Sequence, residues 1–191
     1  TVKPLPIAIT HFIGQTSQEI ELGKSISNVI RMDLERSGLF SPIDKKAFID
    51  VERSLNTVPQ FQNWRVLNAQ ALVQGQITIM SNNQMKAQFR LWDVFAQQQM
   101  VGQVYTTVSS NWRRIAHIVA DAIYKRVTGE EGYFDSRIVY IAETGSLMRR
   151  IKRLAIMDQD GENHHFLTDG SSLVLTPRFS PSHQEITYMS Y

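Results

Sequence analysis

The residues best suited to chemistry gather near the C-terminal end of the sequence, where two aspartates, Asp158 and Asp160, stand just before Gly161. Closely spaced carboxylates occur in calcium loops, which need oxygen ligands at alternate positions and a glutamate at the twelfth. With Gly161 at the sixth position, Ile156 and Leu167 would fill the first and twelfth, and neither carries a side-chain oxygen. We interpret the stretch as a hairpin turn in which the glycine supplies positive φ and the acids bond backbone amides.

Zinc coordination would have to rely on histidines, because the chain contains no cysteine and therefore no thiolate ligand or disulfide. His164 and His165 are neighbours, and neighbouring side chains on a strand point to opposite faces, so the two do not converge on one ion. His11, His117 and His183 show no ligand spacing. We therefore predict no metal site and no cofactor, and we interpret His117, near the apolar stripe of a predicted helix, as a hydrogen-bonded structural residue.

Nucleophilic catalysis by serine would need a Gly-x-Ser-x-Gly elbow between a strand and a helix. The two partial matches, Gly145-Ser146-Leu147 and Gly170-Ser171-Ser172, both lack the second glycine. The sequence also contains neither a Walker loop nor a dinucleotide fingerprint. These patterns predict a protein that is not an enzyme.

The net charge of +2 is too small to indicate a nucleic acid or a membrane surface as a partner. The candidates for anion contact are the basic run Arg149-Arg150-Ile151-Lys152-Arg153 and the group Trp112-Arg113-Arg114. Without an aromatic platform beside the run, we interpret it as a solvated strand end whose arginine stems cover apolar surface. No apolar run reaches the length of a membrane span, so the chain is predicted not to cross one.

The first part of the chain shows the patterns of a mixed α/β domain. Apolar residues recur at helical spacing from Ser17 to the stop at Ser37-Gly38, and again from Asn111, the predicted cap, to Gly129. Apolar runs and alternating patterns predict strands at 6–9, 71–79, 85–91 and 101–108, with a short helix near 61–67. We predict an α/β domain with a mixed sheet and two main helices over residues 1–134.

After Phe134 the pattern becomes that of an antiparallel all-β unit, with short strands separated by turn residues. The predicted strands are 138–142, 151–157, 165–167 and 186–189. The boundary between the two parts is expected near Phe134, so residues 135–191 form the second unit.

The order of motifs in the second unit resembles the repeat of a TolB-type β-propeller. The matching positions are Asp158-Gln159-Asp160-Gly161-Glu162-Asn163, Leu167-Thr168, Pro177-Arg178-Phe179-Ser180-Pro181 and Ile186-Thr187-Tyr188. Upstream segments are similar to the amino-terminal domain of the same family. These are Pro6-Ile7-Ala8-Ile9, Val73-Gln74-Gly75-Gln76-Ile77, Arg90-Leu91-Trp92-Asp93, Trp112, His117, Ala120-Asp121, Val127-Thr128-Gly129 and Gly132 to Tyr140. The resemblance covers essentially the whole chain.

The resemblance to the TolB family implies an α/β domain followed by the first blade region of a β-propeller, incomplete at Tyr191. It implies that the blade-motif residues serve the structure. These residues are Asp158, Asp160, Gly161, Pro177, Phe179, Ser180 and Pro181. The family's partner contacts lie mainly in later blades and in a short segment before the first strand, after which this chain is expected to begin.

The resemblance further implies a non-catalytic scaffold of the Tol-Pal system in the periplasm of a Gram-negative bacterium, with its signal peptide removed. The implied partners are the lipoprotein Pal and the inner-membrane protein TolA, and also bacteriocins. The implied role is support of outer-membrane integrity and of envelope constriction during cell division. The alternative is a propeller module that gates a hydrolase or peptidase domain encoded further along the chain.

Overall fold

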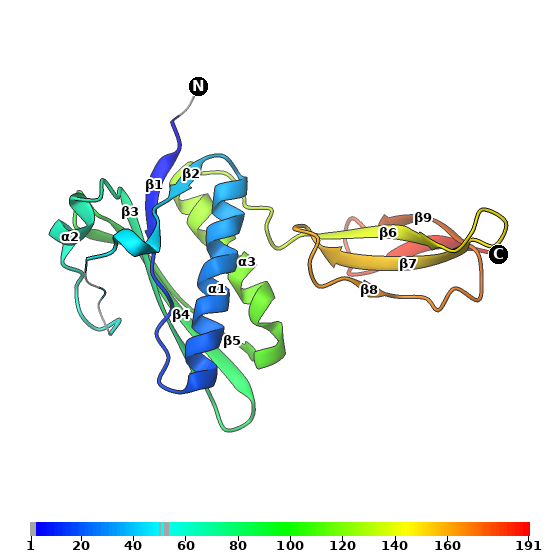
Figure 1. Cartoon of the computed structure of the whole chain (residues 1–191), viewed down its shortest axis with the longest axis horizontal. Helices are drawn as coiled ribbons and strands as arrows, with labels where there is room; N and C mark the ends of the chain where they lie inside the picture. The colour runs from blue at the N-terminus through cyan, green and yellow to red at the C-terminus, as the bar shows by residue number, and fades with distance from the viewer. Residues whose placement is uncertain (1–2, 50, 52–53) are drawn as a thin grey trace. The chain divides into compact units, whose positions relative to one another are not determined.

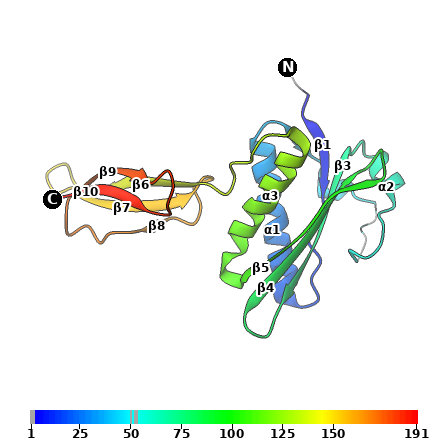
Figure 2. The same ribbon diagram turned by 180° about the vertical axis from the view of Figure 1, so that it is seen from behind.

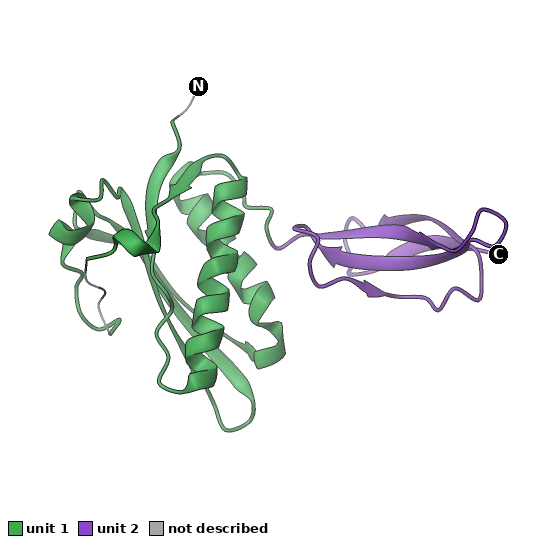
Figure 3. Cartoon of the chain, viewed as in Figure 1, with its two compact units in different colours: residues 1–134 green, residues 135–191 purple. Residues whose placement is uncertain are grey.

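The structure is a computed structural model that describes residues 3–49, 51 and 54–191 (Figure 1). The chain divides into two compact units, Thr1–Phe134 and Asp135–Tyr191 (Figure 3). The first is a mixed α/β unit with two main helices and the second is built from strands, which confirms the predicted fold class. That each unit is a folding domain stays a prediction.

A five-stranded mixed sheet forms the first unit, with the strand order β2-β1-β3-β4-β5. β1 (Leu5–Ile9) lies between β2 (Phe40–Pro42) and β3 (Ala71–Ile79) and pairs in parallel with both. β4 (Gln84–Asp93) and β5 (Gln98–Val108) extend the sheet in antiparallel pairing. The predicted strands are confirmed, whereas the sequence pattern overlooked β2, a strand of three residues that is too short to show alternation.

Helices α1 (Ser17–Arg36) and α3 (Trp112–Thr128) lie side by side and cover one face of this sheet (Figures 1 and 2). The alternation in β4 explains the main core, because its odd-numbered residues from Met85 to Leu91 are buried while Lys86, Gln88 and Arg90 between them are half-buried. The buried stripes of both helices pack onto these side chains. The main core of the unit therefore lies between the two helices and the sheet.

The two helices begin differently. Thr16 is the N-cap of α1, where its side chain accepts from the Glu19 N–H at 3.2 Å in a capping box. Asn111 stands at the start of α3, as predicted, but the prediction that it caps the helix is wrong. Its backbone (φ −88°, ψ 14°) is not extended, because the helical turn Ser109–Asn111 precedes α3, and its side chain instead donates to Thr107 at 3.3 Å. Gly129 ends the helix at φ +81°, as predicted.

The residues that the structure describes cover the opposite face of the sheet in part. The short helix α2 (Phe61–Arg65) and its neighbouring loops pack Trp64 onto a second apolar cluster that includes Leu72 and Trp92. The Trp92 indole N–H donates to the Gln74 side-chain oxygen at 3.0 Å within this layer. Further along β3, β4 and β5 the residues on this face are polar and partly exposed.

Two glycines let α1 approach the sheet closely, because Phe12 lies between them. A Cβ on Gly23 in α1 would lie 2.1 Å from the Phe12 carbonyl oxygen, and one on Gly75 in β3 would lie 2.3 Å from its ring. Distances this short are repulsive, so Phe12 can reach both elements only while both positions lack side chains.

Gly75→Ala should lower the free energy of unfolding of the first unit by about 1–3 kcal/mol, because the methyl group overpacks against the buried Phe12 ring. Gly102→Ala is the matched control in the same sheet, since its Cβ meets only the flexible carboxamide of Gln99 and should cost less than about 0.5 kcal/mol. Urea unfolding followed by circular dichroism measures both. Equal losses for the two variants would contradict the role given to Phe12.

The second unit consists of two antiparallel sheets. One contains β6 (Arg137–Thr144), β7 (Ile151–Asp158) and β8 (His165–Phe166), and the other pairs β9 (Val174–Phe179) with β10 (Ile186–Ser190). The four predicted strands are confirmed. The sequence pattern overlooked β9, because a proline within a run argues against a strand.

The second unit buries few side chains. Its buried residues are Leu154, Ala155, Ile156, Asp158 and Val174. Several large apolar side chains, including Phe166, Phe179 and Tyr188, stay more than two-fifths exposed. Burial of apolar area is the main stabilising term in folding, so the unit gains little stability by itself.

We predict that limited proteolysis of the 191-residue chain cleaves first within residues 135–191 and leaves a resistant fragment that ends near Phe134. The reason is the low burial of the second unit, which makes local opening easy. Mass spectrometry of the fragments over time gives the order of cleavage. Protease resistance that extends uniformly to Tyr191 would contradict this expectation.

Candidate functional site

The acidic turn joins β7 to β8 and has the geometry of a hairpin turn. Gly161 has φ +88°, and its N–H donates to the Asp158 carbonyl oxygen at 3.0 Å. The Glu162 N–H donates to the carboxylate of Asp160 at 3.2 Å. The predicted turn is therefore confirmed, and this acid bonds a backbone amide as expected.

The Pro-Arg-Phe-Ser-Pro string spans the end of β9 and the turn that follows. The Ser180 hydroxyl accepts from the N–H of His183 at 3.1 Å, and the Ser180 N–H donates to the Glu185 carbonyl oxygen at 2.9 Å. Phe179 is 45% exposed at the end of β9. These bonds support the structural role of the blade motif, which stays a prediction.

The histidine pair is divided between different partners. His164 stands just before β8 and its Nδ1 lies 2.5 Å from the Tyr140 hydroxyl, whereas His165 Nδ1 lies 3.2 Å from the Asn163 carbonyl oxygen. Only His165 lies on a strand, so the prediction that both histidines lie on one strand and point to its opposite faces is wrong for His164. The structure gives each ring its own neighbour and does not bring the two onto a common point.

His117 is a buried, hydrogen-bonded residue, as predicted. Its Nδ1 lies 2.6 Å from Oδ2 of Asp33, and the two side chains join α3 to α1 inside the core. Sequence reasoning missed Asp33, although the apolar stripe of Ile26 and Ile30 continues through its position. A charged residue on a buried helical stripe is a signal for a buried partner.

The serines and the basic run lie in structural settings. Ser171 donates to the Asp169 carboxylate at 2.7 Å in a turn. Arg150 and Lys152 both pair with Glu143 of the adjacent strand, at 2.6 and 2.8 Å. The Lys152 hydrogen bond is the main cause that lowers the Glu143 pKa. Pairing with Glu143 offsets one charge of the run, which weakens its attraction for a nucleic acid and supports its interpretation as a solvated strand end.

Glu19 connects three segments of the first unit. Its Oε2 accepts from the N–H groups of Gln15 and Thr16 at 2.8 and 3.0 Å, and its Oε1 accepts from the Ile79 N–H at 2.7 Å. Burial by itself raises the pKa of this carboxyl, but the three backbone donors and the Thr16 hydroxyl outweigh burial and lower it. Glu19 thus acts as a charged clamp between the start of α1 and the end of β3.

Glu19→Gln should lower the free energy of unfolding by about 1–3 kcal/mol at pH 7, because the amide loses the charge and one acceptor oxygen. The folded-state pKa lies below the ordinary value of 4.5, so this stabilisation is present above that pH and is lost as the pH falls below it. The difference between the wild type and the variant should therefore shrink toward pH 3.

The matched control is Glu21→Gln, which removes an exposed ion pair with Lys24 on the same helix and should cost less than about 0.5 kcal/mol. Urea unfolding of all three proteins between pH 3 and 7 measures the differences. A Glu19→Gln loss that does not depend on pH would refute the charged clamp.

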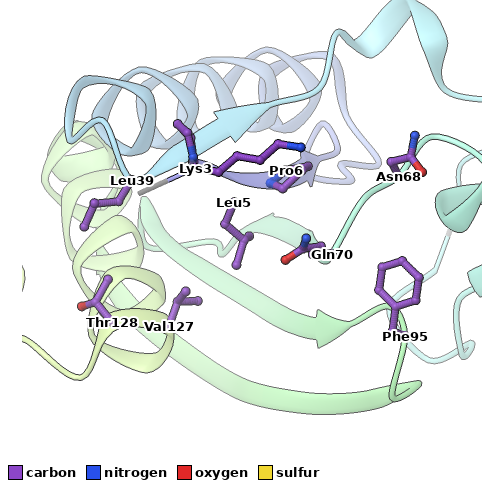
Figure 4. A pocket seen from close by; sticks show the side chains of 10 residues that line it. Lys3, Leu5, Pro6, Leu39, Asn68, Gln70, Phe95, Val127 and Thr128 are labelled. Carbon is purple, nitrogen blue, oxygen red and sulfur yellow. The ribbon is translucent and has the colours of Figure 1, made fainter. Parts of the chain in front are cut away.

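An apolar cleft of about 700 Å³ opens beside the beginning of β1 (Figure 4). Leu5 lies at its centre, with Phe95 at one end and Val127 at the other. Phe95 is 56% exposed although it is large and apolar. Among the described lining residues Lys3 is the single charged one, so the cleft has the chemistry of a contact surface more than of a catalytic centre.

Comparison with known proteins decides the family. Residues 1–100 match the model of the TolB amino-terminal domain, and residues 124–191 match that of the TolB beta propeller domain. The chain is 58% identical over 190 residues to the Tol-Pal system protein TolB of Paramagnetospirillum magneticum, which covers 100% of this chain and 42% of the relative. The chain belongs to the TolB family. The predicted resemblance is confirmed.

A solved structure agrees with TolB-family membership. The crystal structure of TolB from Acinetobacter baumannii superposes with a TM-score of 0.79 at 26% identity, covering 97% of this chain and 43% of that chain. The chain thus spans less than half the length of these two TolB-family relatives. None of the helices among the described residues is long and apolar enough to cross a membrane.

Proposed function

We propose that this protein is a non-catalytic interaction scaffold of the Tol-Pal system. The observation that carries the proposal is the 58% identity, along the whole chain, to a protein named as a TolB of that system. Identity at this level over two consecutive structural units favours retention of the same surfaces as well as the same fold. A scaffold needs a rigid framework that presents contact surfaces, and its function lies in those surfaces.

The chemistry of the described residues supports a scaffold. The acidic turn, the glycine-serine turns and the buried histidine each make bonds that hold local structure. The apolar cleft beside β1 and the exposed aromatic residues of the second unit offer surface for contact with proteins. We infer that the protein works by binding, with no reaction of its own.

The proposed partners are Pal and TolA, with bacteriocins as further ligands, and the proposed location is the periplasm of a Gram-negative bacterium. In this proposal a completed propeller binds Pal, and the amino-terminal side of the protein communicates with TolA. Together these contacts support outer-membrane integrity and envelope constriction during cell division. The support for each of these points is membership of the TolB family.

The experiment is a calorimetric titration of the complete gene product with purified Pal ectodomain. We expect a one-to-one complex with a dissociation constant in the micromolar range or tighter, about −8 kcal/mol or better. The 191-residue chain serves as the comparison and should bind more weakly, because in this proposal the contacts lie mainly in later blades. The absence of a complex at tens of micromolar protein would count decisively against Pal as the partner.

A further inference from the structure

The strand β5 is an open edge of the first unit's sheet. It pairs with β4 on one side, and the sheet order places it outermost (Figure 2). The Ser109 N–H donates to the Asn83 carbonyl oxygen. Because hydrogen-bonded pairs alternate along an antiparallel ladder, the backbone N–H and C=O groups of the odd-numbered residues of β5 point toward β4. The N–H and C=O groups of the even-numbered residues therefore point away from the sheet. These residues are Gly102, Val104, Thr106 and Val108.

Within the described residues of the first unit, most of the open edge lacks the usual protection against strand pairing. Natural edges are blocked by charges, prolines, bulges or covering segments. From Gln98 to Asn111 the sequence holds neither a charged residue nor a proline. A bulge near Met100, whose carbonyl oxygen accepts from Arg126 at 3.3 Å, closes only the beginning of the strand. Val104 is 52% exposed further along.

A polar pocket of about 420 Å³ adjoins this edge on the face that the helices leave uncovered. Arg90 of β4 lies opposite Gly102 of β5 in the sheet register, and both line the pocket. Gly102 has no side chain, and the atoms nearest to the place where its Cβ would stand belong to the carboxamide of Gln99. The pocket thus reaches from the interior of the sheet face to the open strand.

Arg90 is the single charged residue among the described residues that line the pocket. Within the described part of the chain its guanidinium forms no ion pair, and the side chains around it include the amides of Gln76, Gln88 and Gln99. The guanidinium carries a positive charge and the amide NH₂ groups can donate beside it, so the pocket can bind an anion. A carboxylate is the anionic group that an extended peptide can supply.

We propose that β5 binds an extended acidic segment of a partner protein as an added strand, and that Arg90 binds a carboxylate of that segment. Backbone bonds to the outward-facing groups would supply the affinity, and the pocket would supply the preference for an acid. An added strand would lie about 10 Å from β4, two strand spacings away. An arginine and a glutamate reaching toward each other over Gly102 span this distance.

The pocket chemistry favours an acidic partner over a second copy of this chain. Two β5 strands paired about a twofold axis would bring together two copies of Arg90 and no carboxylate, because β5 carries no acid. Such a pair would satisfy the backbone groups and leave both guanidinium groups without an anion. The proposal concerns a surface other than the propeller and does not depend on Pal or TolA.

The test uses the ¹⁵N-labelled 191-residue chain and a capped synthetic peptide, Thr-Val-Thr-Glu-Thr-Val-Thr, with its glutamine counterpart as the neutral probe. We expect amide shifts confined to β5 and the Arg90 side chain, and at least fivefold weaker binding of the glutamine peptide. Arg90→Gln should lower the affinity for the glutamate peptide at least fivefold and leave the affinity for the glutamine peptide unchanged. Lys86→Gln, on the same face of β4 opposite Thr106, is the matched control and should change binding less than twofold.

A second variant tests the backbone part of the proposal. Val104→Pro removes an N–H that points away from β4, so the sheet should remain folded while both peptides bind at least tenfold more weakly. The spectrum of the free variant verifies the fold. Equal affinity of the two peptides, shifts outside β5, or equal effects of Arg90→Gln and Lys86→Gln would overturn the proposal. Sedimentation of the peptide-free chain as a dimer through β5 would also overturn it, in favour of a second copy.

Discussion

The packing of Phe12 between α1 and β3 is the constraint on which the first unit depends. Its carbonyl oxygen lies against Gly23 and its ring against Gly75, so both glycines must lack a side chain for α1 and β3 to pack on it. Glu19 then fixes the helix along its axis by binding the Ile79 N–H at the end of β3. With α1 in place, α3 packs beside it and the buried Asp33–His117 pair joins the two helices.

This one-sided packing has a consequence for function. Both long helices lie on the same face, and among the described residues the other face is covered where α2 and its loops pack around Trp64. The remainder of that face keeps its polar residues accessible, and β5 keeps a free edge. The same arrangement that gives the unit a rigid core therefore leaves surfaces on which another protein can bind.

The second unit buries much less of its apolar side chains than the first. Its turns are well defined by Gly161 and Ser180, but its strands leave large apolar side chains exposed. In repeat architectures each unit buries its faces against neighbouring repeats, so a single repeat by itself leaves apolar side chains exposed. The hairpin turn at Gly161 lies within the residues that match the TolB beta propeller domain.

Local patterns determined much of this protein. Helical spacing and glycine stops placed α1 and α3, alternation placed β4, and the Asp-Gly turn between β7 and β8 followed from a glycine's freedom at positive φ. Only the tertiary structure decided the rest. The three-residue β2 and the Asp33–His117 pair depend on residues far apart in sequence. The proline-bearing β9 and the Arg90 pocket beside Gly102 depend on the register of neighbouring strands. Such contacts depend on register and packing, which no local period of 2 or 3.6 residues encodes.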